Sequence, residues 1–212
     1  WLLDQQLSQL MAPAPNSLWL DELLSLPSTV LQPLLRRWCH KLQAPAPPAR
    51  IFAQFSSQFL AASDAQPQLS WQGWSLRRYR RNLHLLPPLP PPPDGFSIAA
   101  QDERAWPSGG RVRLRASRGG DVNAIGTATD LEMPSGRRLN IKEGFQSIGV
   151  QPWVREHWPR LRRADQIVAL ANWPGVGAQD ILEFQWLAPP TWARYWVEQG
   201  QGAAFPLKSG DT

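Results

Sequence analysis

Apolar side chains recur every three or four residues through much of residues 1–60, which is the spacing of one face of an α-helix. The first stripe contains Leu2, Leu3, Leu7 and Leu10. Prolines separate it from further stripes within residues 18–24, 30–42 and 51–59. The pattern predicts a helical first half. Thr29, with Gln32 three residues later, predicts a capping box at the start of the longest helix.

The hydrophobic period changes to alternation over residues 68–85. Apolar and polar residues alternate on both sides of Gln72-Gly73, which predicts a small hairpin with its turn at these two residues. The basic run RRYRR at 77–81 prolongs the second strand. Residues 87–93 then hold six prolines. Because proline continues neither a helix nor a central strand, this run predicts an extended, semi-rigid spacer.

After the spacer the pattern mixes strands and helices. Residues 111–115 alternate arginine with Val112 and Leu114, which predicts a strand with one arginine face. Residues 117–121 predict a turn, the short apolar run at 167–171 predicts a strand, and alternation at 182–186 predicts another. Residues 139–148 predict a helix that ends at Gly149, and Pro152 predicts the start of a short one. Thr191 predicts the cap of a last helix, followed by a loose end.

Together these elements predict an α+β protein with two domains. We expect a mostly α-helical domain with a terminal hairpin at 1–86, a proline-rich linker at 87–105 and a small mixed α/β domain at 106–212. The length of 212 residues fits one or two domains. The chain opens at Trp1 inside a predicted helix, so we expect it to be a piece of a longer protein.

Composition narrows the class of function. No apolar run reaches the roughly 18 residues that a membrane span needs. The only cysteine is Cys39, which excludes an intramolecular disulfide and a cysteine metal cage. The three histidines, His40, His84 and His157, are scattered without the spacing of metal ligands. The sequence therefore predicts neither a membrane span nor a metal site.

No catalytic constellation stands out. Cys39 and His40 are adjacent on a predicted helix and point about 100° apart, so a thiol enzyme is only a minor alternative. The segment Ser108-Gly109-Gly110 begins like the phosphate-binding loop Ser-Gly-Gly-x-Asp-Ser, but Val112 and Arg113 replace its Asp and second Ser. We therefore predict no catalytic residue and no cofactor site in this chain.

Arginine beside aromatic residues is the strongest candidate chemistry. The chain has 22 basic residues, of which all but three are arginine, 12 tryptophans and a net charge of +5. Guanidinium groups pair with phosphates and stack on bases, which is typical of RNA-binding proteins. A genome with GC-rich codons would give a similar composition, and we favour core positions for the tryptophans. The clusters are Arg36 and Arg37; Arg77, Arg78, Arg80 and Arg81; Arg137, Arg138 and Lys142; Trp153 and Arg155; and Arg160, Arg162 and Arg163.

Several segments resemble tRNA(Ile)-lysidine synthetases of bacteria. Residues 34–86 are similar to the central, substrate-binding domain of that family through LRRW at 35–38, AQPQLSW at 65–71 and LRRYRRNL at 76–83. Residues 136–171 are similar to its C-terminal domain through FQSIGVQPWVRE at 145–156 and DQIVA at 165–169. Three departures stand out: Glu143 replaces one of two family lysines beside Lys142, Gln151 replaces a proline before Pro152-Trp153, and residues 95–134 align poorly.

The resemblance implies an ATP-dependent ligase that attaches lysine to the wobble cytidine of the minor, AUA-reading isoleucine tRNA in the cytoplasm. ATP, magnesium and lysine would bind an N-terminal catalytic domain outside this chain, so we expect the chain alone to be inactive. Its partner would be the tRNA, and a homodimer stays possible.

The implied RNA-binding residues divide into two groups. Arg77, Arg78, Arg80 and Arg81 would help to place the tRNA body. Arg138, Lys142, Trp153 and Arg155 would form part of a patch for the acceptor stem. Arg36, Arg37 and Arg137 are further RNA-binding candidates. The alternative is a protein-interaction module in which the proline run recruits a partner and the arginines only maintain solubility.

Overall fold

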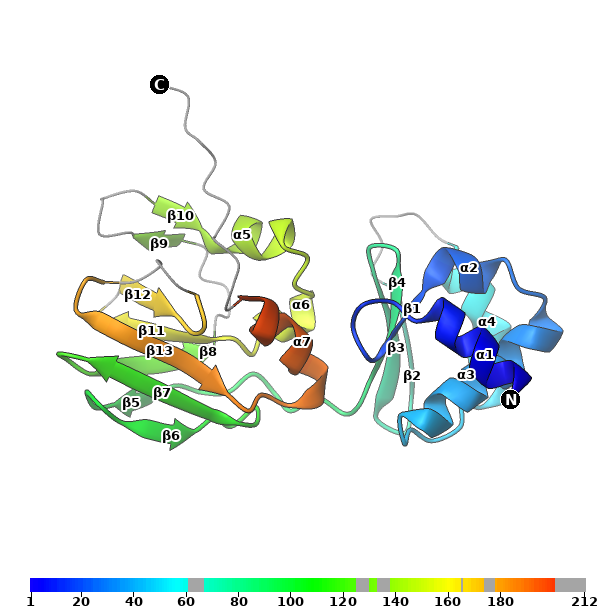
Figure 1. Ribbon diagram of the computed structural model, residues 1–212, viewed down its shortest axis with the longest axis horizontal. Helices are drawn as coiled ribbons and strands as arrows, with labels where there is room; N and C mark the ends of the chain where they lie inside the picture. Colours follow the sequence, from blue (N-terminus) through cyan, green and yellow to red (C-terminus); the bar gives the residue numbers. More distant parts are fainter. Residues whose placement is uncertain (61–66, 125–129, 133–137, 165, 174–177, 201–212) are drawn as a thin grey trace, which may run out of the picture. The chain divides into compact units, whose positions relative to one another are not determined.

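The computed structural model describes residues 1–60, 67–124, 130–132, 138–164, 166–173 and 178–200. It divides into two compact units, Trp1–Leu89 and Pro90–Thr212 (Figure 1). Both units combine helices with antiparallel strands, so the predicted α+β class is confirmed. The boundary between the units falls inside the proline run.

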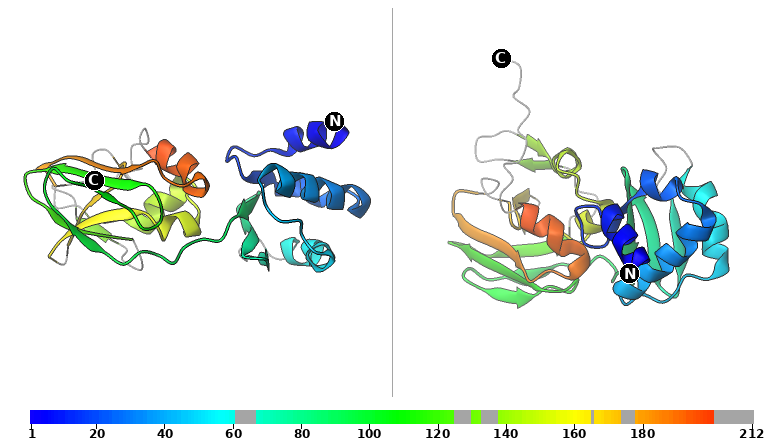
Figure 2. Two further views of the ribbon diagram at one scale, coloured as in Figure 1. Left: turned by 90° about the horizontal axis from the view of Figure 1, so that it is seen from below. Right: turned by 45° about the vertical axis from the view of Figure 1, so that its right-hand side comes forward.

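The first unit packs four helices on one face of a four-stranded antiparallel sheet of order β1-β4-β3-β2 (Figure 2). In chain order its elements are α1 (Leu2–Leu10), β1 (Ser17–Trp19), α2 (Leu20–Leu24), α3 (Ser28–Lys41), α4 (Ala49–Phe59), β2 (Gln68–Trp71), β3 (Trp74–Tyr79) and β4 (Asn82–Leu86). Leucines of the helices and of β3 and β4 share one core, so each layer buries the apolar face of the other.

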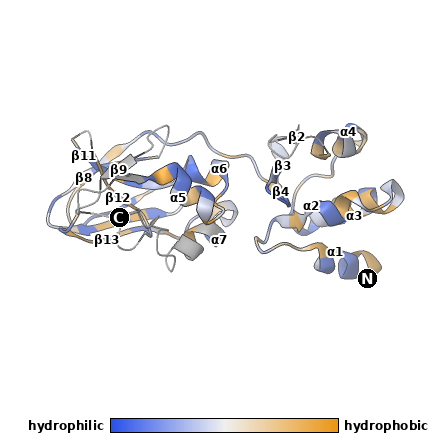
Figure 3. Cartoon of the chain, turned by 90° about the horizontal axis from the view of Figure 1, so that it is seen from above, coloured by the Kyte–Doolittle hydropathy of each residue, from blue (hydrophilic) through white to orange (hydrophobic). Residues whose placement is uncertain are grey.

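The spacing of apolar residues explains α3, the longest helix of this unit. In α3, Leu31, Leu34, Leu35 and Trp38 are buried, and they follow the i, i+3, i+4, i+7 pattern. Figure 3 shows apolar residues recurring along α3 between polar ones. The predicted capping box is wrong: the N-cap is Pro27, and no side chain bonds the backbone there. The helix starts earlier than the pattern suggested, so Thr29 already lies inside its first turn.

The predicted hairpin is present as β2 and β3, but two further strands were missed. Arg80 has a φ of 55°, and the chain turns back there so that Tyr79 pairs with Asn82 at the start of β4. On its other edge, β4 pairs with the short strand β1. A left-handed arginine is an unusual turn residue, and therefore the basic run looked like one continuous strand.

The chain contacts the first unit at the start of the proline run and the second unit just after its end. A Cβ on Gly73, whose φ is +81°, would lie 2.9 Å from Cγ of Pro88, so Pro88 packs on the β2–β3 turn. At the other end, a Cβ on Gly95 would meet the side chain of Asn123. The strands β5 (Phe96–Ile98) and β6 (Glu103–Ala105) lie within the stretch assigned to the linker, and both belong to sheets of the second unit.

The second unit contains a four-stranded sheet of order β12-β11-β8-β5, a three-stranded sheet of order β13-β7-β6 and the hairpin β9-β10, all antiparallel. Its remaining elements are β7 (Arg111–Ala116), β8 (Gly120–Ala124), β9 (Asp130–Glu132), β10 (Arg138–Asn140), α5 (Ile141–Ser147), α6 (Pro152–Arg155), β11 (Pro159–Arg163), β12 (Gln166–Leu170), β13 (Ile181–Leu187) and α7 (Thr191–Gly200). The sequence predicted β7, β12, β13 and the helices, and it missed β5, β6, β8, β9, β10 and β11.

Sequence signals set both ends of α5. The side chain of Asn140 accepts a hydrogen bond from the backbone N–H of Glu143, which caps the helix N-terminus. At the other end Gly149 has a φ of +78°. The N–H groups of Gly149 and Val150 donate to the carbonyls of Gln146 and Phe145, which is the Schellman arrangement. The helix stop predicted at Gly149 is therefore confirmed.

Aromatic side chains fill the core of the second unit. The ring of Phe145 lies 4.9 Å from that of Trp158 and 4.8 Å from that of Trp173, centroid to centroid. The indole N–H of Trp158 donates to the carbonyl of Ala171, and that of Trp186 donates to the carbonyl of Gly109. The indole N–H groups of Trp158 and Trp186 therefore have acceptors inside the core, which removes the cost of burying them.

A buried histidine borders this core. Nδ1 of His157 lies 2.7 Å from Oγ of Ser108, and the indole of Trp106 donates to the His157 carbonyl. Burial lowers the pKa of His157 from 6.5 to about 4. His84 of the first unit is also buried, and burial lowers its pKa to about 3. Both rings are neutral in the folded chain at neutral pH.

We expect the chain to lose stability as the pH falls from 6.5 toward 4. In this range the unfolded chain binds protons on His84 and His157 that the folded chain does not bind, so the free energy of unfolding decreases with pH. For His157 the loss amounts to about 3 kcal/mol once the pH is below its folded pKa. Urea unfolding at pH 7.5, 6.0 and 5.0 measures the effect.

His157→Gln provides the internal check, because glutamine does not titrate. This variant should show a weaker pH dependence than the parent chain, whereas the exposed His40→Gln should match the parent. Identical pH profiles for the parent and His157→Gln would contradict the assignment.

Candidate RNA-binding surfaces

The turn between β3 and β4 presents two predicted site residues at the surface of the first unit. Arg80 is exposed, and its guanidinium lies 5.6 Å from the centroid of the Tyr79 ring. Nε of Arg81 donates to Oδ2 of Asp21 at 2.7 Å, and both side chains are largely exposed. An exposed ion pair contributes little to stability, so an RNA phosphate could replace Asp21 at low cost. The left-handed backbone at Arg80 is what places both arginines on the turn.

Arg77 and Arg78 lie half-buried on β3, and they differ from the turn arginines. Arg78 donates from Nη1 to the carbonyl of Phe59 at 3.1 Å and from Nε to the carbonyl of Arg80 at 3.2 Å. It therefore ties β3 to the end of α4 and braces the turn. Nε of Arg77 donates to Oγ of Ser75 at 3.2 Å. The guanidinium groups of these two arginines therefore bond within the unit, and neither side chain is fully exposed.

Arg36 and Arg37 are neighbours on α3 but have different surroundings. Arg37 donates from Nε and Nη2 to the two carboxylate oxygens of Asp4, both at 2.9 Å, and Nζ of Lys41 also reaches Asp4 at 2.8 Å. The hydrogen bond from Arg37 is the main reason that the pKa of Asp4 lies far below its usual range. Arg37 thus fastens α1 to α3. Arg36 is exposed and lies 5.1 Å above the ring of Phe52.

The second predicted group is only partly at the surface. Lys142 is exposed in the first turn of α5. Arg155 is half-buried, and its Nε donates to the carbonyl of Val150 at 2.7 Å. The backbone of Arg138 pairs with Glu132 in the β9–β10 hairpin, whereas Arg137 lies outside the described residues.

Trp153 corrects one expectation directly. The prediction needed an indole that RNA could reach, but Trp153 is only 4% exposed. It lies in the short helix α6, where Val154 is buried as well. The sequence shows that Trp153 and Val154 are apolar, but it does not show whether other side chains bury them. Trp153 is thus a core residue in this structure, like most of the tryptophans.

The arginine face predicted for β7 is real, and its charge is compensated. Arg111 and Arg113 both bond Glu103 of β6 at 2.7 Å, and Arg115 lies 3.2 Å from Glu183 of β13. Antiparallel pairing of β7 with both neighbours brings these acids across from the arginines. The sequence could not supply this information, because the acids come from separate strands.

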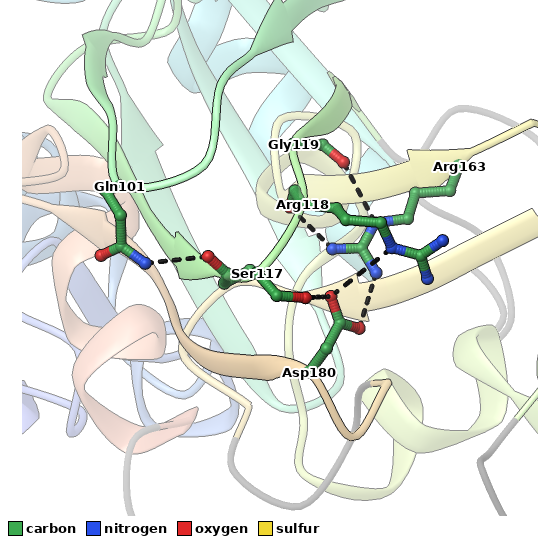
Figure 4. A network of polar contacts seen from close by, with 7 residues as sticks. Gln101, Ser117, Arg118, Gly119, Arg163 and Asp180 are labelled. Atoms are coloured by element: carbon green, nitrogen blue, oxygen red, sulfur yellow. Dashed lines mark hydrogen bonds and ion pairs between the residues drawn. The ribbon is translucent and has the colours of Figure 1, made fainter.

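Arg163 is the most enclosed of the arginines that form these ion pairs, with a side chain 14% exposed. Figure 4 shows its guanidinium at the centre of a polar network. It donates to Oδ1 of Asp180 at 2.7 Å and to the carbonyls of Arg118 and Gly119 at 2.8 and 3.1 Å. The hydrogen bond from Arg163 is the main reason that the pKa of Asp180 falls to about 2. This arginine joins β11 to the β7–β8 turn and to the segment before β13.

The groups that could suggest other chemistry are inert or dispersed. Cys39 is 1% exposed, and burial raises the pKa of its thiol to about 12, which makes it a poor nucleophile. Within the described ranges, no three His, Cys, Asp or Glu side chains cluster as metal ligands. In that same part of the chain, no helix is both long and apolar enough to cross a bilayer.

Most of the first unit matches a known class of domain. Residues 18–84, from β1 almost to the end of β4, match the family described as the TilS substrate binding domain. This stretch contains the β3–β4 turn with Arg80 and Arg81. This stretch is therefore similar to a family of substrate-binding domains.

Curated relatives extend the match into the second unit. The chain is 32% identical over 179 residues to the tRNA(Ile)-lysidine synthase of Methylococcus capsulatus, covering 74% of this chain and 41% of the relative. It is 35% identical over 144 residues to that of Alkalilimnicola ehrlichii, covering 60% and 32%. For Pectobacterium atrosepticum it is 30% over 218 residues, covering 92% and 46%.

The chain is thus related over most of its length to tRNA(Ile)-lysidine synthases, and this confirms the resemblance seen in the sequence. It spans less than half the length of these three relatives.

We expect Arg163→Met to destabilise the second unit by about 2 kcal/mol. The substitution removes three hydrogen bonds that the charged guanidinium donates to Asp180 and to the carbonyls of Arg118 and Gly119. Arg115→Met removes a more exposed ion pair and should change stability by less than about 1 kcal/mol. Urea unfolding followed by tryptophan fluorescence compares the two variants. Equal effects would mean that the network contributes no more than the surface pair.

Proposed function

We propose that this chain is the tRNA-holding part of a tRNA(Ile)-lysidine synthase, the ATP-dependent ligase that attaches lysine to the wobble cytidine of the AUA-reading isoleucine tRNA. The chain would bind and orient the tRNA in the cytoplasm. The ligation itself, with ATP, magnesium and lysine, would take place in another part of the protein. On this proposal the 212 residues alone do not catalyse ligation.

The observation that carries the proposal is the β3–β4 turn inside the substrate-binding match. Arg80 and Arg81 lie at the surface of residues 18–84, one beside an aromatic ring and the other held by an exposed carboxylate. Exposed guanidinium groups on a rigid turn suit the phosphates of a folded RNA, which proteins recognise by shape and backbone. Arg36 and Lys142 add exposed positive charge, each in its own unit.

We expect the double variant Arg80→Gln/Arg81→Gln to bind the isoleucine tRNA several-fold more weakly than the parent chain. Removing two phosphate contacts should also reduce the slope of log affinity against log salt by roughly 1 to 2. Fluorescence anisotropy with labelled tRNA over a salt series gives both quantities. Arg104→Gln is the matched control, because Arg104 is an exposed arginine of the second unit that pairs with Asp102.

Two outcomes would contradict this assignment. Unchanged affinity and slope in the double variant would remove the turn from the interface. An equal loss in Arg104→Gln would mean that net charge, and not the turn, controls binding.

A protein-interaction module is the second candidate, since Pro88, Pro91 and Pro92 are exposed along an extended segment. Replacing residues 90–93 by Gly-Ser-Gly-Ser keeps the length and removes the stiffness. If the segment is a spacer between two RNA-binding units, tRNA affinity should fall modestly, by about two- to tenfold, because the flexible chain holds the units less favourably. Unchanged tRNA affinity would favour the interaction module over the spacer.

A further inference from the structure

Arg160 stands apart from the other arginines of the second unit. It lies on β11, opposite Asn123 of β8, and its neighbour Leu161 is fully buried opposite Val122. Because side chains alternate along a strand, Arg160 points to the face of the sheet away from Leu161. The side chain is half-buried, and its Nε and Nη1 atoms are enclosed. In the part of the chain that the structure describes, neither atom has a hydrogen-bond partner.

Other arginines in the same unit, from the enclosed Arg163 to the more exposed Arg115, show how the positive charge is normally compensated. Arg163 has Asp180, Arg113 has Glu103, and Arg115 has Glu183. No described carboxylate pairs with Arg160 in this way. Instead, Arg162 lies two residues along the strand, and burial together with this second positive charge lowers the pKa of Arg160. The acid that this unit places beside its other arginines is missing here.

An uncompensated guanidinium in a half-buried position lowers stability, because its donors lose water without gaining a partner. The residue directly opposite has a similar deficit: Oδ1 of Asn123 is enclosed and lacks a partner among the described residues. An apolar residue at position 160 would remove this cost. Polar groups that reduce stability in this way are typical of binding sites, where a ligand supplies the missing partner.

We propose that Arg160 is a phosphate-binding residue on the face of the sheet β12-β11-β8-β5 opposite to Leu161, with Arg162 adding positive charge. A phosphate group supplies several acceptor oxygens and the negative charge that the site lacks. This step rests on the proposed function, in which the phosphate belongs to the backbone of the bound tRNA. Binding would therefore extend to this sheet, beyond the β3–β4 turn and α5.

The first experiment uses inorganic phosphate as the probe and does not depend on RNA. Thermal unfolding of the chain is compared in phosphate and in chloride at equal ionic strength. Phosphate should raise the melting temperature of the parent chain, and this rise should be lost in Arg160→Gln. Arg115→Gln is the control, because Arg115 already has Glu183 and should keep the parent response.

The second experiment uses the isoleucine tRNA in a salt series. Arg160→Gln should bind about three- to tenfold more weakly and reduce the salt slope by roughly one, as expected for one lost phosphate contact. Arg115→Gln should leave both quantities unchanged.

The third experiment tests the stability argument. Arg160→Met keeps an unbranched side chain of similar reach and removes the charge. Without phosphate it should melt at the same temperature as the parent or at a higher one. A lower melting temperature would show that the guanidinium is a structural partner, and the inference would be wrong.

The outcomes separate this inference from the proposed function. If the parent chain fails to bind tRNA, the proposed function fails, while the phosphate response still decides whether the site exists. If tRNA binds and Arg160→Gln equals the parent in both the phosphate and the tRNA experiments, the inference fails and the proposed function stands. A phosphate response with an unchanged tRNA slope would support the anion site and reject the RNA backbone as its source.

Discussion

Charge compensation of arginine controls much of this structure. A guanidinium taken out of water needs an acceptor for each donor, and the fold meets this demand by bringing acids from elsewhere in the chain. Asp4 of α1 reaches Arg37 of α3, which fixes the first helix against the third. Asp180 reaches Arg163, which joins β11 to the β7–β8 turn and to the segment before β13. Arginines paired with acids in this way link separate elements of the fold.

The same constraint divides the basic residues by role. Arg78 donates to two backbone carbonyls and positions the turn, whereas Arg80 lies beside the ring of Tyr79 at the surface. The two side chains come from one basic run in the sequence, yet one supports the turn and the other projects from it. Binding surfaces commonly require such a supporting layer, because an exposed arginine is useful only when its backbone is held still. A net charge of +5 alone therefore overstates how much of the surface can hold RNA.

Local patterns predicted the elements whose reasons are local. The helices α3 and α4 follow from apolar spacing, and the end of α5 follows from Gly149. Strands such as β1, β4, β8 and β11 were missed because their pairing partners come from distant segments of the chain. Gly120 looks like a turn residue, but a Cβ there would lie 2.5 Å from the carbonyl of Arg162, so glycine permits β8 to approach β11. Likewise, Arg80 turns the chain without glycine, and no propensity rule marks it.

Prediction from the sequence alone is limited in the same way at the candidate site. Sequence clusters located the basic segments, and the family resemblance suggested RNA as their ligand. Neither could distinguish an arginine that holds the fold together from one that is available to a ligand. That distinction depends on which carboxylates arrive nearby, as when Glu103 meets both Arg111 and Arg113. By this criterion Arg160 is the exception. Its Nε and Nη1 atoms are buried, as in an arginine that holds elements together, but among the described residues no acid pairs with it. When a fold that elsewhere supplies acids to its buried arginines leaves one without, the missing counter-charge points to a ligand.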